Sequence, residues 1–152
     1  MKTILVCGLP GSGKTFLAKA LKQELESKQY KVEWFNADIV REQFNDWDFS
    51  PAGRHRQMIR MKILADKAKE SGSYAICDFV CPTKLLRQDF AADIVIWMNT
   101  IDQGRFEDTN KMFEQLDTNE YHVIITKDEW WNALFAKMWA ERVIKKLTDA
   151  KL

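Results

Sequence analysis

Short apolar runs alternate along this chain of 152 residues with segments whose apolar positions recur every three to four residues. The runs, together with one segment that alternates polar and apolar residues, predict strands, and the helical spacing predicts amphipathic helices. The expected strands are residues 2–7, 31–35, 73–78, 93–98 and 121–125, and the expected helices are residues 14–28, 51–71 and a closing helix to about residue 147.

Strands that alternate with helices indicate an α/β fold, because the crossovers between parallel strands place helices on both faces of a sheet. We expect three layers, with a five-stranded parallel sheet in the middle, and a single domain over residues 1–152. The segment Thr126-Lys127-Asp128-Glu129 has the form of a capping box and predicts the start of the closing helix. The expected buried faces are Phe16, Leu17, Ala20, Leu21 and Leu25 on the first helix, Met58, Met61, Leu64, Ala65 and Ala68 on the long helix, and Trp130, Trp131, Leu134, Met138 and Trp139 on the closing helix.

The turn between the first strand and the first helix has the pattern G-x-x-x-x-G-K-T. Glycines let consecutive backbone N–H groups point at phosphate oxygens, and the following helix adds the positive end of its dipole. A lysine at this position reaches the β- and γ-phosphates, and the threonine hydroxyl ligates Mg²⁺. A glycine turn that binds nothing is disfavoured by the flanking strand and helix. We therefore expect ATP and Mg²⁺ as cofactors and a P-loop kinase fold, with ATP bound by Gly8, Pro10, Gly11, Ser12, Gly13, Lys14 and Thr15.

Two acidic residues follow predicted strands on the side of the sheet where ligands of α/β proteins bind. Asp38 follows the second strand, where its carboxylate could accept a proton from a hydroxyl or hold Mg²⁺, and Arg41 could grip an anion beside it. The plainer interpretation is that Asn36 or Asp38 caps a helix. Asp78 ends the third strand and is a second candidate for holding Mg²⁺.

Residues 103–118 form a charged segment in which Arg105 and Lys111 fit a mobile lid that closes over ATP. An ordinary amphipathic helix explains the same pattern equally well.

Composition gives no support for a nucleic-acid-binding protein or a membrane protein. Apolar residues make up 46% of the chain, charged residues make up 30%, and the net charge of +1 gives no overall field that would favour nucleic acid. No apolar run approaches 18 residues, and the chain begins with a strand pattern rather than a signal peptide. The cysteines are Cys7, Cys77 and Cys81, without metal-binding spacing. These features predict a cytoplasmic protein with no membrane partner.

Four segments within residues 1–90 resemble the adenylylsulfate (APS) kinase family. They are the phosphate-binding turn, Asn36-Ala37-Asp38-Ile39-Val40-Arg41 at the place of D-G-D-N-V-R, Asp48-Phe49-Ser50 with Arg54 and Gln57 at the place of F-S-x-x-D-R-x-x-N, and Phe79-Val80-Cys81-Pro82 at the place of F-I-S-P. The resemblance implies phosphoryl transfer from ATP to APS with Asp38 as the catalytic aspartate, assisted by Lys14 and Arg41. It implies an APS site made by Asp38, Arg41, Phe49, Arg54, Gln57 and Cys81.

The chain also departs from this family. The stretch F-T-G-I-D-D-P-Y-E is missing after residue 110, and Asp78 stands where the family has a small residue. The replaced residues include an aspartate, which is Asn36 here, an asparagine, which is Gln57, and a serine, which is Cys81.

Alternatives to the APS reading therefore stay open. The spacing Asn36-x-Asp38-x-x-Arg41 also resembles polynucleotide 5′-hydroxyl kinases, so that a phage-type kinase acting on a 5′-hydroxyl or a hydroxymethylated base of DNA is one alternative. A nucleotide-binding regulatory module is an alternative of another class. The expected partner is APS or, alternatively, DNA, and a homodimer is possible.

Overall fold

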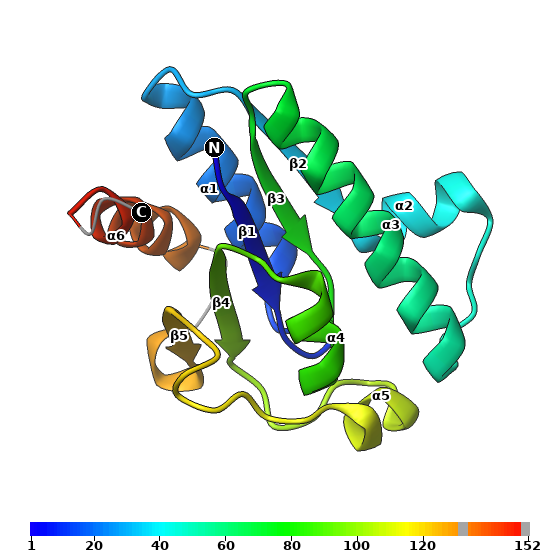
Figure 1. Ribbon diagram of the computed structural model, residues 1–152. Coiled ribbons are helices and arrows are strands. Elements are labelled where there is room, and N and C mark those ends of the chain that lie inside the picture. Colours follow the sequence, from blue (N-terminus) through cyan, green and yellow to red (C-terminus); the bar gives the residue numbers. More distant parts are fainter. Residues whose placement is uncertain (131–133, 150–152) are drawn as a thin grey trace.

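The computed structural model describes residues 1–130 and 134–149, and they form one sheet flanked by helices (Figure 1). All strand pairs are parallel and the strand order is β2-β3-β1-β4-β5, which confirms the expected five-stranded parallel sheet. The strands are β1 (Thr3–Cys7), β2 (Val32–Asn36), β3 (Tyr74–Asp78), β4 (Ile94–Asn99) and β5 (Val123–Thr126). The helices are α1 (Lys14–Ser27), α2 (Ala37–Phe44), α3 (Pro51–Glu70), α4 (Lys84–Phe90), α5 (Glu107–Met112), the 3₁₀ turn η1 (Lys127–Glu129) and α6 (Phe135–Asp149).

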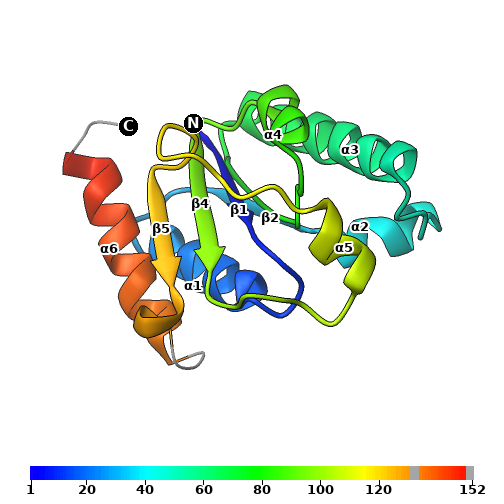
Figure 2. The ribbon, with the colours of Figure 1, turned by 90° about the horizontal axis from the view of Figure 1, so that it is seen from below.

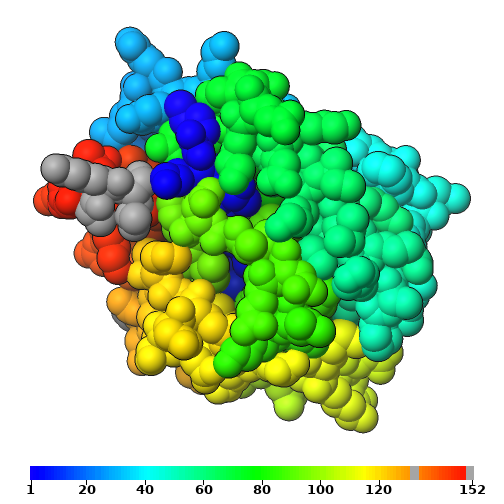
Figure 3. All heavy atoms as spheres, viewed as in Figure 1, coloured from blue at the N-terminus to red at the C-terminus, as the bar shows by residue number. Residues whose placement is uncertain are grey.

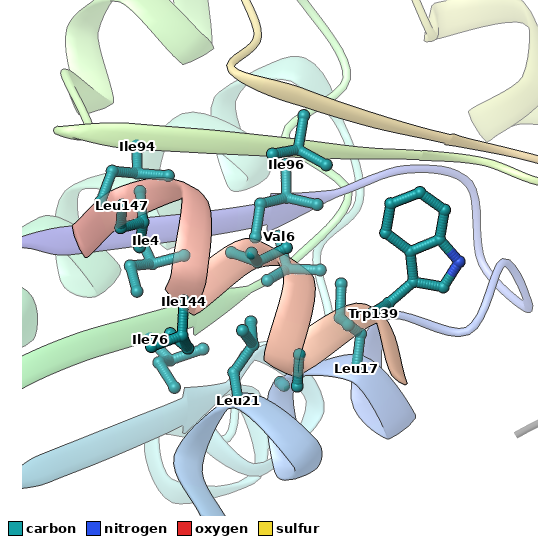
Figure 4. Close-up of a cluster of buried hydrophobic side chains, with 14 of the residues drawn as sticks. Ile4, Val6, Leu17, Leu21, Ile76, Ile94, Ile96, Trp139, Ile144 and Leu147 are labelled. Carbon is teal, nitrogen blue, oxygen red and sulfur yellow. The ribbon is translucent and has the colours of Figure 1, made fainter. Parts of the chain in front are cut away.

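Helices cover both faces of the sheet, so the three expected layers are present. The view from below shows α1 and α6 on one side of the strands and α3 and α4 on the other (Figure 2). The buried cluster under α1 and α6 joins side chains such as Leu21 and Ile144 to Ile96 of β4 (Figure 4). The second cluster lies under α3 and α4, whose green atoms cover much of the face seen in the space-filling view (Figure 3).

The side chains of three residues cap the N-termini of the helices α2, α3 and α4. The Asn36 side-chain oxygen accepts from two N–H groups of the first turn of α2, and the Ser50 hydroxyl accepts from Gly53 N at 3.2 Å to start α3. Thr83 does the same for α4 through Leu86 N at 3.1 Å. Pro51 follows Ser50 at the first position of α3, where a missing N–H costs nothing. The expected start of the long helix at residue 51 is thereby confirmed.

One short helix, α4, was missed by the sequence interpretation. A helix at the place of α2 was expected only as the plainer interpretation, in which Asn36 or Asp38 caps it, and α2 extends to Phe44. The capping interpretation of Asn36 holds, because this residue starts α2. Helices of seven and eight residues, such as α4 and α2, show too few apolar repeats for periodicity to identify them.

The expectation for the closing helix was wrong in two respects. The capping box at Thr126 and Glu129 closes only η1, and α6 begins later, at Phe135. Trp130 leaves the helical conformation, with φ of −140°, and its indole lies against the backbone at Gly13. Leu134, expected to be buried, is 86% exposed, and Trp131 lies outside the described residues. Trp139 is buried as expected.

No helix among the described residues is long and apolar enough to cross a membrane. The cysteines Cys7, Cys77 and Cys81 are free and buried.

The face of α1 that packs on the sheet differs from the expected one at Phe16, which is 56% exposed, whereas Leu21 is completely buried. We expect Leu21→Ala to lower the free energy of unfolding by about 2–5 kcal/mol, because the removed atoms leave a cavity between α1 and α6. Phe16→Ala, on the same helix, should cost less than about 1 kcal/mol. Urea unfolding of the two variants measures both values, and equal losses would contradict this packing.

Candidate active site

The carboxyl ends of β1, β2 and β3 open into one cavity of about 610 Å³. The cavity runs from the phosphate loop (Gly8–Thr15) past α2 to α5 and the segment that follows β3. It brings together almost all of the residues that the sequence analysis selected. Those that line it are Pro10, Gly11, Lys14, Thr15, Asp38, Arg41, Phe49, Arg54, Gln57, Asp78, Cys81 and Arg105.

Residues that follow β4 and η1 hold the phosphate loop in place. Gly13 has a φ of +100° and lies so close to Trp130 that a Cβ atom there would stand 2.7 Å from the indole nitrogen. The Thr100 hydroxyl donates to the Ser12 carbonyl at 2.7 Å. A left-handed backbone with no room for a side chain requires glycine at this position of the loop.

Lys14 reaches back over this loop, and its Nζ donates to the Leu9 carbonyl at 2.9 Å. Burial lowers the pKa of Lys14 from its ordinary 10.5 to about 8, although the charge of Asp78 opposes that shift. The lysine is therefore a desolvated cation directed at the space above the loop, where an anion would restore its usual pKa.

Asn36 connects the metal candidates to each other. Its Nδ2 donates to Thr15 Oγ1 at 3.3 Å and to the two carboxylate oxygens of Asp78 at 3.3 and 3.2 Å. Its Oδ1 accepts from the backbone N–H of Asp38 at 3.1 Å and of Ile39 at 3.2 Å. The hydroxyl and the carboxylate that sequence analysis assigned to Mg²⁺ thus share one hydrogen-bond donor.

Asp78 is 2% exposed, and burial raises its pKa from 3.8 to about 6. Hydrogen bonds from Trp34 Nε1, at 2.6 Å, and from Asn36 oppose this shift, as does the charge of Lys14. A carboxylate this buried, with a cation and two donors beside it, is suited to hold a divalent ion.

Asp38 stands apart from this cluster, in the first turn of α2, and is exposed at the cavity. Arg41, on the same helix, is 4% exposed and donates through Nη1 to the carbonyls of Asp46 and Asp48 at 3.0 and 3.1 Å. The carboxylate is thus accessible to a bound molecule, and the buried guanidinium holds the loop that follows α2.

Phe49 lies close to two guanidinium groups. The Arg41 Cζ is 4.3 Å and the Arg54 Cζ is 5.4 Å from the centre of its ring. Arg54 also donates to the Phe49 carbonyl at 3.0 Å and to the Thr109 hydroxyl at 2.7 Å. Burial lowers the pKa of both arginines. The ring remains 48% exposed and can stack on a planar ligand beside two cations.

The loop that carries Phe49 is fixed from α3. Arg56 pairs with the carboxylates of Asp46 and Asp48 at 3.1 and 2.8 Å, and Arg60 pairs with Asp46. The Gln57 amide, buried beneath, donates to the Ala37 carbonyl at 3.0 Å and joins α3 to α2.

Cys81 forms part of the cavity wall and is 1% exposed, and burial raises the pKa of its thiol well above the ordinary value. Its carbonyl accepts from Arg87 at 3.1 Å. A thiol with such a pKa remains protonated, which fits a packing role rather than that of a nucleophile.

The expected lid, residues 103–118, contains the short helix α5. Arg105 lies at the cavity mouth over the Phe106 ring, whereas Lys111 does not line this cavity and pairs with Glu107 at 3.5 Å. Asn110 binds both backbone groups of Gly104, at 2.8 and 3.0 Å, and so closes the turn between them.

Sequence analysis missed several residues of this region, among them Trp34, Phe106, Thr109 and Trp130. Trp34, Thr109 and Trp130 each lie against a residue at least 44 positions away, and Phe106 lines the cavity from the segment that was expected to be a lid. The alternation in β2 could have pointed to Trp34, because its side chain leaves the strand two residues before Asn36 on the same face. No local pattern pointed to Thr109.

We expect the raised pKa of Asp78 to be visible in stability. The folded protein binds this proton more tightly than the unfolded chain, so the stabilising effect of the neutral carboxyl is complete below pH 3.8 and is lost as pH rises through about 6. From pH 4 to pH 7, wild type should lose about 2–3 kcal/mol of unfolding free energy relative to Asp78→Asn. Denaturant unfolding of both proteins across this range measures the difference, and a difference independent of pH would refute the shift.

Comparisons with known proteins agree with this geometry. The family model described as adenylylsulphate kinase matches residues 1–100. The adenylyl-sulfate kinase of Halothermothrix orenii is 30% identical over 87 residues, 57% of this chain and 47% of that protein. That of Bacillus pumilus is 31% identical over 117 residues, 76% of this chain and 54% of that protein. The chain spans about half the length of the curated relatives it matches.

Solved structures show the same fold. The APS kinase CysC of Mycobacterium tuberculosis, in complex with AMPPNP and APS, superposes with a TM-score of 0.75 at 20% identity, with 97% of each chain covered. The hexameric APS kinase of Thiobacillus denitrificans superposes with a TM-score of 0.75 at 24% identity over 97% of this chain and 29% of that one. The P-loop kinase fold is thereby confirmed. Because the family model matches 100 of the 152 residues and covers the phosphate loop, Asp38 and Asp78 alike, the chain belongs to the adenylylsulfate kinase family.

Proposed function

We propose that this protein transfers the terminal phosphoryl group of ATP to a hydroxyl of APS. The observation that carries the proposal is the single cavity, which joins the phosphate loop at one end to the Phe49 ring, flanked by Arg41 and Arg54, at the other. A donor and an acceptor bound at these two ends would meet beside Asp38, and fixing two reactants in this way lowers the barrier to transfer.

Each end has the chemistry for its ligand. The loop N–H groups and Lys14 would bind phosphates, and Lys14 is buried with its Nζ bonded to the Leu9 carbonyl. APS combines a planar base with an anionic mixed anhydride, which suits stacking on Phe49 and the two guanidinium groups. Arg105, at the mouth, would contact ATP as the lid closes.

Mg²⁺ fits the residues present. The Thr15 hydroxyl and the Asp78 carboxylate are hard oxygen donors that face one another across the Asn36 amide, and Mg²⁺ in such kinases takes one or two protein oxygens together with phosphates and water. When bound, the ion neutralises charge on the transferring phosphates. Asp38, exposed and separate from this pair, would accept the proton of the acceptor hydroxyl.

We also propose a cytoplasmic location, since all three cysteines of the chain are free and buried as thiols.

We expect Asp38→Asn to lower turnover by about a hundred- to ten-thousandfold, the usual range for loss of a general base. The affinity for ATP should change little, because Asp38 is not part of the phosphate loop. Steady-state kinetics at saturating Mg²⁺-ATP separate the two effects, and the exposed Asp89 on α4 offers Asp89→Asn as a control. If Asp38→Asn is nearly as active as wild type, Asp38 serves only as part of the helix.

The acceptor is tested by offering Mg²⁺-ATP with APS, 5′-hydroxyl DNA, DNA with hydroxymethylated bases, or no acceptor. We expect transfer to APS that weakens only gently with salt, because APS is one small anion. Transfer to DNA would instead fall steeply with salt, since each phosphate contact releases counterions.

Labelling of DNA while APS is left untouched would replace the APS proposal with a polynucleotide kinase. ATP turnover that needs no acceptor would favour a regulatory nucleotide-binding module.

A further inference from the structure

We infer that Asn36 is a positioning residue for its neighbours in the site. We infer also that its side chain must be an amide, because the adjacent strand end already carries a carboxylate, that of Asp78. The inference rests on the proposed phosphoryl transfer for its catalytic consequence, although the pairing itself can be tested by stability. It goes beyond the roles assigned to Thr15, Asp38 and Asp78, because it concerns a side chain that hydrogen-bonds to all three residues.

The sheet places the two side chains together. Asn36 and Asp78 are the last residues of β2 and β3, and they are partners in the parallel register. Partners in neighbouring strands point to the same face, about 4.8 Å apart at the backbone. Their contact therefore follows from the register of the two strands and needs no loop to bring it about.

Both ends of the Asn36 amide are occupied by groups of opposite hydrogen-bonding character. The oxygen accepts from two backbone N–H groups, of Asp38 and Ile39, and the nitrogen donates to Asp78 and to Thr15. A reversed amide would turn its NH₂ group toward N–H donors and its oxygen toward a carboxylate. Only one orientation satisfies all of these partners, so the side chain is fixed.

An aspartate at position 36 would still cap α2 but would lose the hydrogen bonds to the Asp78 carboxylate. One of its oxygens could accept from the helix, as Oδ1 does now, but the other would lie where Nδ2 is, 3.2 Å from the Asp78 carboxylate. A carboxylate oxygen cannot donate a hydrogen bond, so the contact that joins Asn36 to Asp78 would be lost and replaced by repulsion between two acceptors.

The two departures from the family motif therefore depend on each other. The resembling motif has aspartate where this chain has Asn36, and a small residue where it has Asp78. The structure makes these two positions partners in adjacent strands. The carboxylate has in effect moved from one strand end to the next, with an amide left in its place.

The position of Asn36 also has a catalytic consequence. Its oxygen fixes the N–H of Asp38, and its nitrogen fixes the Thr15 hydroxyl, so one rigid side chain sets the distance between the proposed base and the proposed metal ligands. Misplacement of a reacting group by about 1 Å can cost about a hundredfold in rate.

The test is a double-mutant cycle of Asn36→Asp, Asp78→Asn and the double exchange Asn36→Asp/Asp78→Asn. We expect Asn36→Asp to lower turnover with APS by at least about a hundredfold. The double exchange restores one carboxylate and one amide and should return to within about tenfold of wild type. The Mg²⁺ concentration for half-maximal rate should rise in Asn36→Asp and fall again in the double exchange, which a purely structural defect would not produce.

Two further variants distinguish the effect of the Asn36 contacts on turnover from the effects of an added charge and of impaired folding. Asn36→Ser keeps a cap but is too short to reach Asp78, so we expect turnover to drop at least about tenfold with nearly unchanged KM for ATP. Asn119→Asp adds the same charge at an exposed turn and should behave as wild type.

Thermal midpoints provide a readout without activity. Asn36→Asp should melt at least about 4 °C below Asn119→Asp, and the double exchange should recover most of that loss. If the wild type proves inactive with APS, the proposed function fails while this stability cycle still tests the pair. Wild-type stability and turnover in Asn36→Asp, or a double exchange no better than Asn36→Asp, would overturn the inference.

Discussion

The parallel register of β2, β3 and β1 is the constraint from which the site follows. Because these strands are neighbours and point the same way, the phosphate loop after β1, the start of α2 after β2 and Asp78 at the end of β3 all emerge at one edge. The remaining walls come from α3, which holds the Phe49 loop, and from the segment around α5, which Arg54 joins through Thr109.

This arrangement puts two desolvated charges of opposite sign near the phosphate loop. Burial lowers the pKa of Lys14 to about 8 and raises that of Asp78 to about 6, and each charge partly offsets the shift of the other. Both shifts mean that the folded chain carries an energetic cost at this edge, which phosphates and a divalent cation would relieve on binding. A site that is less stable than its surroundings until its ligands arrive is a common compromise between stability and activity.

The sequence alone was sufficient to predict the features that depend on a local pattern of residues. Apolar runs and one alternating segment identified all five strands, and the G-x-x-x-x-G-K-T turn identified the phosphate loop, because each feature is written in consecutive residues. Periodicity failed for α2 and α4, which are too short to repeat, and for Leu134 and Phe16, whose burial depends on where the helix starts and how it is rotated. Contacts such as Trp34 with Asp78 depend on strand register, which one sequence does not reveal.

The register of β2 and β3 also changes how the departures from the family motif are interpreted. Taken one at a time, Asn36 and Asp78 each weaken the resemblance to the APS kinase pattern, whereas in space they complement one another. Gly53 stands at the aspartate of F-S-x-x-D-R, and a Cβ there would lie 2.5 Å from the Asp48 carboxyl carbon, so that Asp48 already occupies the room an aspartate at position 53 would need. Asp48 meanwhile pairs with Arg56 and holds the loop of Phe49. In both cases a carboxylate from another position in the chain lies close to the place where the motif has one, and for that reason the altered residues argue less against an APS-like acceptor site than their number suggests.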